Sequence, residues 1–250
     1  ATPEENVDSA VSGVEDGKRR LVASGKGTDQ LVVYDGDTGQ RLRTVGGTGT
    51  ALGQLQRPNG VATIDDRYLF VVERDNHRVQ MFQLPDFTPL LAFGADALQQ
   101  PYGLWVQPKG EGYEVLVSDA YMAGEDAQGE DIIPPLAQLD RRFRRYELTQ
   151  AGGKWTARDA GAFGDTGAAG AIRVPESLFG DAANNRLLVA EEDVPTGTLL
   201  REYDLQGRYL GRDVGKGQYV AQAEGIALMR CADGSGWWVA SDQFADRTVF

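Results

Sequence analysis

The chain has 250 residues, of which 25% are charged, and its 37 acidic and 25 basic side chains give a net charge of −12 at pH 7. This length and composition fit one globular domain with a sizeable core. The acidity excludes the basic footprint that nucleic acids and anionic membranes require, and no apolar run approaches the roughly 18–20 residues of a transmembrane helix.

The N-terminal part of the chain predicts one small sheet. Residues 1–18 are polar, and we expect them to form an extended lead-in. Apolar, β-branched runs then predict strands over residues 20–24, 30–35 and 41–45. The glycines that follow lack the Gly-Lys-Ser/Thr sequence of a phosphate-binding loop, so we interpret them as an exposed turn between sheets.

A short phrase then recurs four times, and each copy is followed by an apolar run that ends in polar residues. The copies are Pro58-Asn59-Gly60-Val61, Pro101-Tyr102-Gly103-Leu104, Pro175-Glu176-Ser177-Leu178 and Ala223-Glu224-Gly225-Ile226. A single small sheet cannot bury both of its faces, so a repeat of about 40–50 residues indicates stacked propeller blades.

The unit that begins at Pro101 is longer than the others because residues 121–140 form an inserted acidic loop. We predict an all-β fold, a β-propeller of four-stranded blades of the six-bladed type, with five to six blades in a single domain over residues 1–250. The chain stops at Phe250 inside a strand-like run, so we expect the last sheet to be cut short or completed from elsewhere.

Cysteine and histidine are too scarce for several common active sites. Cys231 is the single cysteine, which rules out an intrachain disulfide, and His77 is the single histidine. A Ser-His-Asp triad or a multi-histidine zinc site would depend on His77 alone. We therefore expect neither, and we interpret Cys231 as a structural thiol.

Carboxylates occupy equivalent positions in successive units. Glu176 and Glu224 hold the same slot of the repeated phrase, and Glu192 ends the strand that follows Glu176. Equivalent points of propeller blades converge at one mouth of the central channel, so these side chains can meet there. Clustered carboxylates repel one another unless a cation is bound, which favours a hard divalent ion. The alternative is three separately solvated strand ends.

Cationic side chains follow other strand runs. Lys26 and Arg74 match the position of Glu192 in their own units, as do Asp119 and Asp242. Such a mixture could hold a polyanion through bound metal and cationic donors; alternatively, each cation is a surface charge. We interpret the remaining arginines of two segments as exposed strand faces: Arg78, Arg141, Arg142, Arg144 and Arg145.

Residues 175–193 and 223–243 resemble the β-propeller phytases, and Leu21-Val22-Ala23-Ser24-Gly25-Lys26 resembles the first blade of that family. The resemblance covers most of the chain, without the family's last blade. It implies a six-bladed propeller that removes phosphate from inositol phosphates with calcium ions at the channel mouth. Residue by residue, it assigns phosphate-site positions to Lys26, Arg74 and Tyr102, and calcium- and phosphate-site carboxylates to Glu176, Glu192 and Glu224.

Two segments depart from the phytase pattern. The family's Asp-Asp-Pro-Ala motif is here Asp8-Ser9-Ala10-Val11, so one calcium ligand would be a serine. Its Asn-Asn-Val-Asp segment is here Arg57-Pro58-Asn59-Gly60-Val61. With residues 73–79, this segment resembles an NHL-type repeat, which occurs in binding propellers and lactonase-like enzymes.

The resemblance thus implies a calcium-dependent phosphomonoesterase that hydrolyses inositol phosphates or related phosphate esters. Calcium would bind the substrate phosphate and a water molecule, and Lys26 and Arg74 would neutralise charge that develops on phosphoryl oxygens. The alternatives are a binding propeller that has lost this chemistry and a metal-dependent lactonase. We expect a monomer with a small-molecule partner, no nucleic-acid or membrane partner, and a periplasmic or secreted location after removal of a signal peptide.

Overall fold

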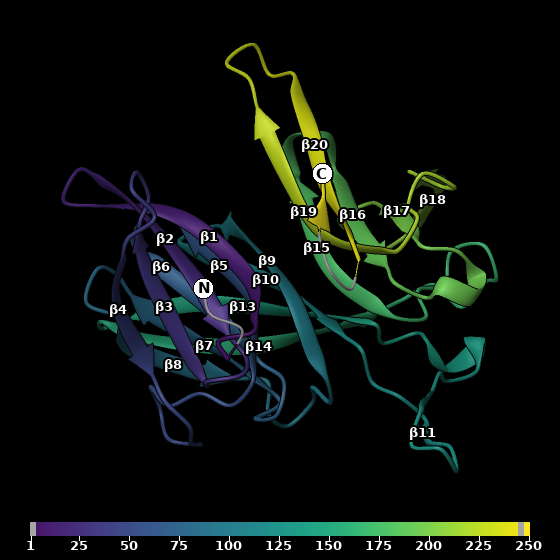
Figure 1. Ribbon diagram of the computed structural model, residues 1–250, viewed down its shortest axis with the longest axis horizontal. Helices are drawn as coiled ribbons and strands as arrows, with labels where there is room; N and C mark the ends of the chain where they lie inside the picture. The colour runs from purple at the N-terminus through teal and green to yellow at the C-terminus, as the bar shows by residue number, and fades with distance from the viewer. Residues whose placement is uncertain (1–3, 245–247) are drawn as a thin grey trace. The chain divides into compact units, whose positions relative to one another are not determined.

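The computed structural model of the protein describes residues 4–244 and 248–250. These residues form antiparallel strands with three short 3-10 turns, and none of them lies in an α-helix. The strands make five small sheets, the blades of a β-propeller, and one separate hairpin (Figure 1). The prediction of an all-β propeller is confirmed.

Each blade is a meander in which the strands of that blade pair in their order along the chain, and in blade 3 the hairpin of the inserted loop lies between the second and third strands. Blade 1 contains β1 (Val7–Glu15), β2 (Lys18–Gly25), β3 (Gln30–Asp35) and β4 (Arg41–Gly46). Blade 2 contains β5 (Pro58–Ile64), β6 (Tyr68–Glu73), β7 (Arg78–Gln83) and β8 (Thr88–Phe93). Blade 3 contains β9 (Pro101–Lys109), β10 (Gly112–Asp119), β13 (Phe143–Ala151) and β14 (Lys154–Phe163).

Blade 4 contains β15 (Pro175–Asp181), β16 (Arg186–Glu191), β17 (Leu199–Tyr203) and β18 (Tyr209–Val214). Blade 5 contains β19 (Gln222–Arg230), β20 (Gly236–Gln243) and β21 (Thr248–Val249). The 3-10 turns are Leu136–Gln138, Ala182–Asn184 and Val194–Thr196. The inserted loop of blade 3 carries the hairpin of β11 (Gly124–Glu125) and β12 (Asp131–Ile132).

The N-terminal segment is a strand and not the extended lead-in that its polarity predicts. β1 pairs with β2 through a tight turn at Asp16 and Gly17, whose φ values are 51° and 74°. An Asp-Gly pair with both φ angles positive is the turn whose twist suits a two-residue hairpin. This local turn chemistry adds a fourth strand to blade 1.

The recurring phrase opens the first strand of a blade, and in β5, β15 and β19 the pairing is irregular within it. The register shifts between Pro58 and Val61 in β5, between Pro175 and Leu178 in β15, and between Ala223 and Ile226 in β19. The same shift occurs in β1, where Asp8 and Ser9 lie between the paired residues Val7 and Ala10. Asp8-Ser9 is therefore a further copy of the phrase, and we call the residue after the first paired one its slot residue.

The contacts divide the chain into two compact units, and blade 3 contributes residues to both. Unit 1 comprises Ala1–Leu116 and Arg145–Ala160, and unit 2 comprises Val117–Arg144 and Gly161–Phe250. That residues 1–250 act as one domain stays a prediction. Among the described residues, no helix is long and apolar enough to span a membrane.

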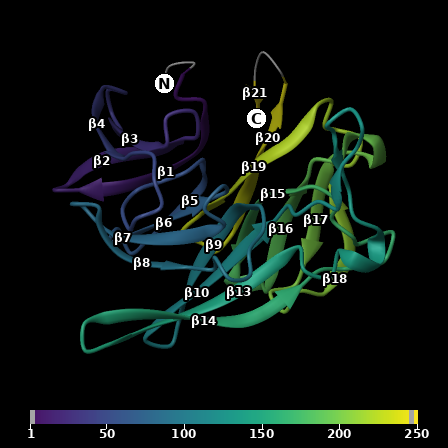
Figure 2. The ribbon, with the colours of Figure 1, turned by 90° about the horizontal axis from the view of Figure 1, so that it is seen from below.

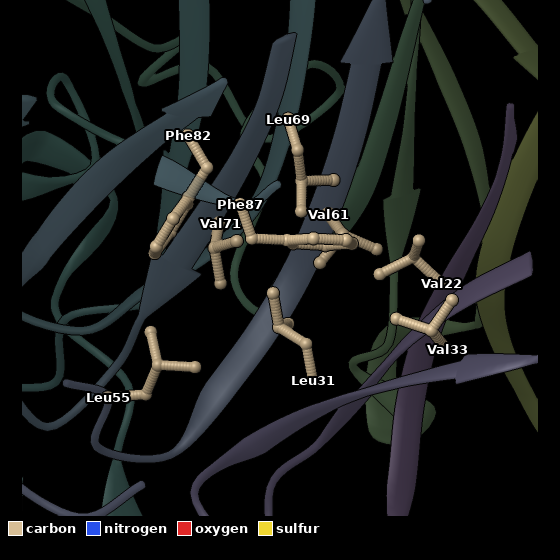
Figure 3. Close-up of a cluster of buried hydrophobic side chains, with 9 residues drawn as sticks. All are labelled: Val22, Leu31, Val33, Leu55, Val61, Leu69, Val71, Phe82 and Phe87. Carbon is tan, nitrogen blue, oxygen red and sulfur yellow. The ribbon is translucent and has the colours of Figure 1, made fainter. Parts of the chain in front are cut away.

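Each unit has an apolar core between neighbouring blades. In unit 1, residues of blade 1 and of blade 2 form one cluster with Leu55 and Phe87: Val22, Leu31 and Val33 with Val61, Leu69, Val71 and Phe82 (Figure 3). In unit 2, Leu188, Ala190 and Leu200 of blade 4 pack with Ile226, Trp238 and Ala240 of blade 5. Burial of each large side chain contributes about 1.5–3 kcal/mol, so face-to-face stacking of blades holds the repeated strands in place.

The sequence pattern predicts that Arg78 lies on an exposed strand face, and this prediction is wrong. Arg78 instead anchors the glycine-rich loop after blade 1. Its side chain, 12% exposed, lies 2.7 Å from the Oε1 atom of the buried Glu73. It also donates to the carbonyl oxygens of Thr50 and Gln54 at 2.7 and 3.1 Å. The NHL-like segment thus has a structural role here, because it binds the backbone of the preceding loop.

Arg142, which we also expect on a surface, is fully buried in unit 2. Its guanidinium donates to the carbonyl oxygens of Ile172 at 3.2 Å, Asp119 at 3.2 Å and Tyr121 at 2.5 Å, and to that of Arg173. A planar guanidinium with five donors suits such a set of backbone acceptors. Arg142 thereby fixes the base of the inserted loop to the segment that leads into β15.

Candidate functional site

Three glutamates of unit 2 come together at equivalent ends of strands. Glu176 and Glu224 are the slot residues of β15 and β19, which contact each other. Glu192 follows β16 directly, and its N–H donates to the carbonyl oxygen of Val174 at 3.0 Å, which holds it beside the start of β15. The repeat therefore places all three carboxylates at one end of these blades.

The geometry of this cluster suits a cation. One carboxylate oxygen of each of the three glutamates lies within 4.8 Å of the others. Glu176 is 4% exposed, whereas Glu192 and Glu224 are half-buried. Two oxygens bound to one calcium ion at about 2.3–2.6 Å each lie at most about 4.6–5.2 Å apart, so a limit of 4.8 Å is compatible with one shared ion. Glu176, Glu192 and Glu224 could therefore hold a metal ion; that they do so stays a prediction.

Neighbouring polar groups fix the positions of the cluster. The hydroxyl of Ser118 donates to the backbone carbonyl of Glu176 at 2.9 Å, which anchors the irregular start of β15. The side-chain amide of Gln222 donates to the Oε1 atom of Glu192. The site is thus built from backbone irregularities that side chains of adjacent strands stabilise.

The adjacent Glu191 has a structural role. Its fully buried carboxylate accepts backbone N–H groups of Arg173 at 2.7 Å and Val174 at 2.8 Å, and burial raises its pKa. Asp242 accepts the equivalent backbone donors before β19 and pairs with Ala223, as Glu191 pairs with Pro175. Asp242 therefore matches Glu191, and the expectation that it matches Glu192 is wrong by one residue.

The cationic residues lie in unit 1, around Asp8, the aspartate that remains of the paired-aspartate motif. Asp8, the slot residue of β1, accepts from the Nζ atom of Lys26 at 2.9 Å and from the hydroxyl of Tyr102 at 2.9 Å. Lys26 follows β2 directly, and Tyr102 is the second residue of β9. Strands β1, β5 and β9 follow one another in this unit (Figure 2).

Arg74 belongs to the same cluster. It follows β6, and its guanidinium carbon lies 6.0 Å from the ring centroid of Tyr102. Its Nη2 atom donates to the side-chain oxygen of Gln100 at 2.9 Å. The structure thus brings Lys26, Arg74 and Tyr102 into one chain of contacts, which we call the Asp8 cluster.

The equivalence of Asp8 with Glu176 and Glu224 becomes visible in the sequence only if residues 7–15 are recognised as a blade strand. Ser9, next to it, is held by its backbone: its N–H donates to the hydroxyl of Ser24 at 3.0 Å, and its carbonyl accepts from that hydroxyl at 3.2 Å. Of the Asp8-Ser9 pair, the aspartate forms the ion pair with Lys26, whereas the serine makes only the backbone contacts with Ser24.

No protein-family model and no curated protein matches the chain. Solved structures do share its fold. Hydrazine synthase of Kuenenia stuttgartiensis matches with a TM-score of 0.55 at 11% identity, covering 96% of this chain and 56% of that chain. A functionally unknown protein from Desulfotomaculum acetoxidans DSM 771 matches with a TM-score of 0.59 at 15% identity, covering 96% of this chain and 66% of that chain. Virginiamycin B lyase from Staphylococcus aureus matches with a TM-score of 0.55 at 10% identity, covering 99% of this chain and 70% of that chain.

These similarities show the fold alone, a β-propeller with about five blades. The chain spans between about half and two thirds of the length of the first two structures, whose covered shares are 56% and 66%. Membership of the phytase-like family stays an interpretation of the sequence.

Proposed function

We propose that this propeller is a phytase-like, calcium-dependent phosphomonoesterase that acts on inositol phosphates or related small phosphate esters. The observation that carries the proposal is the cluster of Glu176, Glu192 and Glu224, with carboxylate oxygens within 4.8 Å of one another. Three carboxylates at this spacing repel one another, and a divalent cation relieves that repulsion.

The donor set favours calcium over other common ions. All three ligands are carboxylate oxygens, which hard cations prefer over the nitrogen and sulfur ligands typical of zinc or copper. Calcium takes about six to eight oxygen ligands in a flexible geometry, whereas magnesium demands a near-ideal octahedron and keeps several of its waters, so a cluster of three glutamates favours calcium. When bound there, calcium supplies positive charge for phosphoryl oxygens and for an attacking water.

The Asp8 cluster supports phosphate as the recognised group. Lys26 offers a compact ammonium and Arg74 offers a planar fork of donors, and both bind phosphoryl oxygens well. Asp8 positions Lys26 and Tyr102, and Gln100 positions Arg74, before any substrate arrives. The proposal requires that changes in this cluster and in the glutamate cluster lower the same activity.

We further propose a monomer that acts in the periplasm or after secretion.

The direct test measures inorganic phosphate released from inositol hexakisphosphate and from p-nitrophenyl phosphate, with saturating calcium and with a chelator. We expect calcium-dependent release by the wild type and by Glu125→Gln, whose exposed carboxylate lies in the inserted loop. Release that never exceeds that of buffer would refute the enzyme proposal and favour a binding propeller. Opening of a lactone in the same calcium series would instead identify a lactonase.

A further inference from the structure

His77 lies in the turn that carries Arg74, between β6 and β7. Its backbone N–H donates to the carbonyl oxygen of Arg74 at 3.3 Å, and its φ of 53° lies in the left-handed region. Few residues other than glycine adopt this region, and histidine, asparagine and aspartate do so most readily. The conformation of His77 therefore closes a tight turn that begins at Arg74, and the side chain of His77 is exposed.

The ring of His77 connects this turn to the segment before β9. Its Nδ1 atom forms a hydrogen bond with the backbone carbonyl oxygen of Gln99. A carbonyl oxygen can only accept, so the proton of this bond belongs to Nδ1. Asn76 ties the same turn to the loop after blade 1, because its amide donates to the carbonyl oxygen of Gly49 at 2.9 Å. The turn is thus held at two places, and His77 makes the link toward β9.

The segment that His77 holds also positions the guanidinium of Arg74. Gln100, the residue after Gln99, accepts from the Nη2 atom of Arg74 at 2.9 Å. The ring of Tyr102, in the same segment, lies 6.0 Å from the guanidinium carbon of Arg74. Loss of the His77 bond would leave the turn and this segment free to shift against each other. The guanidinium would then no longer have one fixed place beside Tyr102.

We propose that His77 is a positioning residue for Arg74 in the hydrolysis of phosphate esters. The inference rests on the proposed function, in which Arg74 donates to a phosphoryl oxygen. His77 does not itself contact the substrate: its bond to Gln99 keeps Gln100, and with it the Arg74 guanidinium, in place. Placement matters because a shift of about 1 Å in a preorganised group can lower a rate about 10²-fold.

Two other roles for His77 predict different responses to substitution. A contact that only stabilises the fold acts independently of Arg74, so its loss has the same effect whether or not Arg74 is present. An imidazole that transfers protons cannot be replaced by an amide, which does not titrate near neutral pH. A double-mutant cycle with Arg74 and a substitution by asparagine therefore separate these roles from positioning.

The test compares His77→Gly with His77→Asn. Glycine accepts the positive φ and removes the ring. Asparagine also tolerates this φ, and its amide nitrogen takes the place of Nδ1 relative to Cβ, so it keeps a donor for Gln99. The matched control is Asp16→Gly, because Asp16 is exposed and has a φ of 51° in the turn between β1 and β2. Phosphate release from inositol hexakisphosphate with saturating calcium gives kcat and KM, and urea unfolding gives the stability of each variant.

We expect His77→Gly to lower kcat about tenfold and to lower the midpoint of urea unfolding by no more than about 0.5 M. His77→Asn should restore kcat, and Asp16→Gly should leave it unchanged. In an Arg74→Ala background, His77→Gly should lower kcat no further, because the group that His77 positions is gone.

A wild type that releases phosphate while His77→Gly keeps its kcat, or lowers it equally with and without Arg74, overturns this inference alone. A His77→Asn variant as slow as His77→Gly also overturns it. A wild type that releases no phosphate above buffer overturns the proposed function, and this inference with it.

Discussion

Arg74 and Lys26 differ in how much of their charge is available to a ligand. Lys26 forms an ion pair with Asp8, in which the lysine side chain is 24% exposed and the aspartate side chain 8% exposed. Arg74 donates to the neutral amide of Gln100 and forms no ion pair within the described residues. Arg74 therefore keeps its full charge for an arriving anion, whereas Lys26 shares its charge with Asp8.

We predict that Arg74→Ala and Lys26→Ala each lower kcat by about 10²–10³, as expected for a lost, preorganised donor to a phosphoryl group. Arg74→Ala should change the free energy of unfolding by no more than about 0.5 kcal/mol, and Lys26→Ala by about 1 kcal/mol because Asp8 loses one partner. The control is Lys154→Ala, an exposed residue of β14. Phosphate assays and urea unfolding measure both effects; unchanged kcat in both variants would remove the cluster from the reaction.

At the scale of the element, the sequence predicts strands and repeated slots well but buried polar contacts poorly. The copies at Pro58, Pro175 and Ala223 are the first strands of their blades, as their apolar runs predict. The apolar pattern does not predict strand β1, because its residues are mostly polar, although Asp16-Gly17 carries the signal of a hairpin turn. The roles of Arg78 and Arg142 could not be predicted, because their partners are backbone carbonyls that only the folded chain brings near.

We predict that Arg142→Met destabilises the protein by about 2–4 kcal/mol, because it leaves several buried carbonyl groups without their donor. Arg142→Lys should recover only part of the lost free energy of unfolding, since the three N–H donors of a lysine share one nitrogen and cannot reach acceptors that are placed around a planar guanidinium. Denaturant unfolding of both variants, with exposed Arg141→Met as the control, measures the difference. Equal stability of Arg142→Met and the wild type would contradict this structural role.

Glu114 in β10 makes stability depend on pH. Burial raises the pKa of its carboxyl, but donors from Lys109 at 2.7 Å and Gln107 at 2.9 Å, with Arg145 at 2.9 Å, outweigh burial and hold the pKa below its ordinary value of 4.5. The unfolded chain then binds this proton more readily than the folded one. The contribution of Glu114 is therefore complete above pH 4.5 and is lost as the pH falls through the lower folded pKa.

We predict that Glu114→Gln destabilises the protein at pH 7 by about 1–3 kcal/mol and that the difference from the wild type shrinks as the pH falls below 4.5. Urea unfolding across this pH range measures it, with Glu111→Gln in the adjacent exposed turn as the control. A difference that stays constant with pH would show that ionisation of Glu114 does not matter.

For the whole molecule, the fold class follows from the sequence and the activity does not. The repeat period and turn residues predict a propeller, and the structure has five such sheets among its described residues. Whether an ion binds, and which substrate is used, would depend on side-chain geometry at a few positions, such as those of Glu176, Glu192 and Glu224. Structures that share the fold at 10–15% identity carry no information about those positions.

We predict that calcium raises the Tm of the whole protein and that a chelator lowers it, because the ion binds the folded carboxylates and not the unfolded chain. Calcium at a hundred times its Kd should add about 2.7 kcal/mol to the free energy of unfolding. Scanning calorimetry in a calcium series measures the shift, with magnesium as the comparison. A Tm that is constant up to millimolar calcium would refute the metal site.

The most direct test of the account is calorimetric titration of calcium into the wild type, Glu176→Gln, Glu224→Gln and Glu125→Gln. Glu176 and Glu224 occupy equivalent slots in the glutamate cluster, whereas Glu125 lies in the exposed hairpin of the inserted loop. We predict that the wild type and Glu125→Gln bind calcium alike and that each of the other two variants binds it at least about tenfold more weakly, since each loses a charged ligand. Weaker binding by Glu125→Gln alone, with the two cluster variants unchanged, would place the calcium site in the loop and contradict the account.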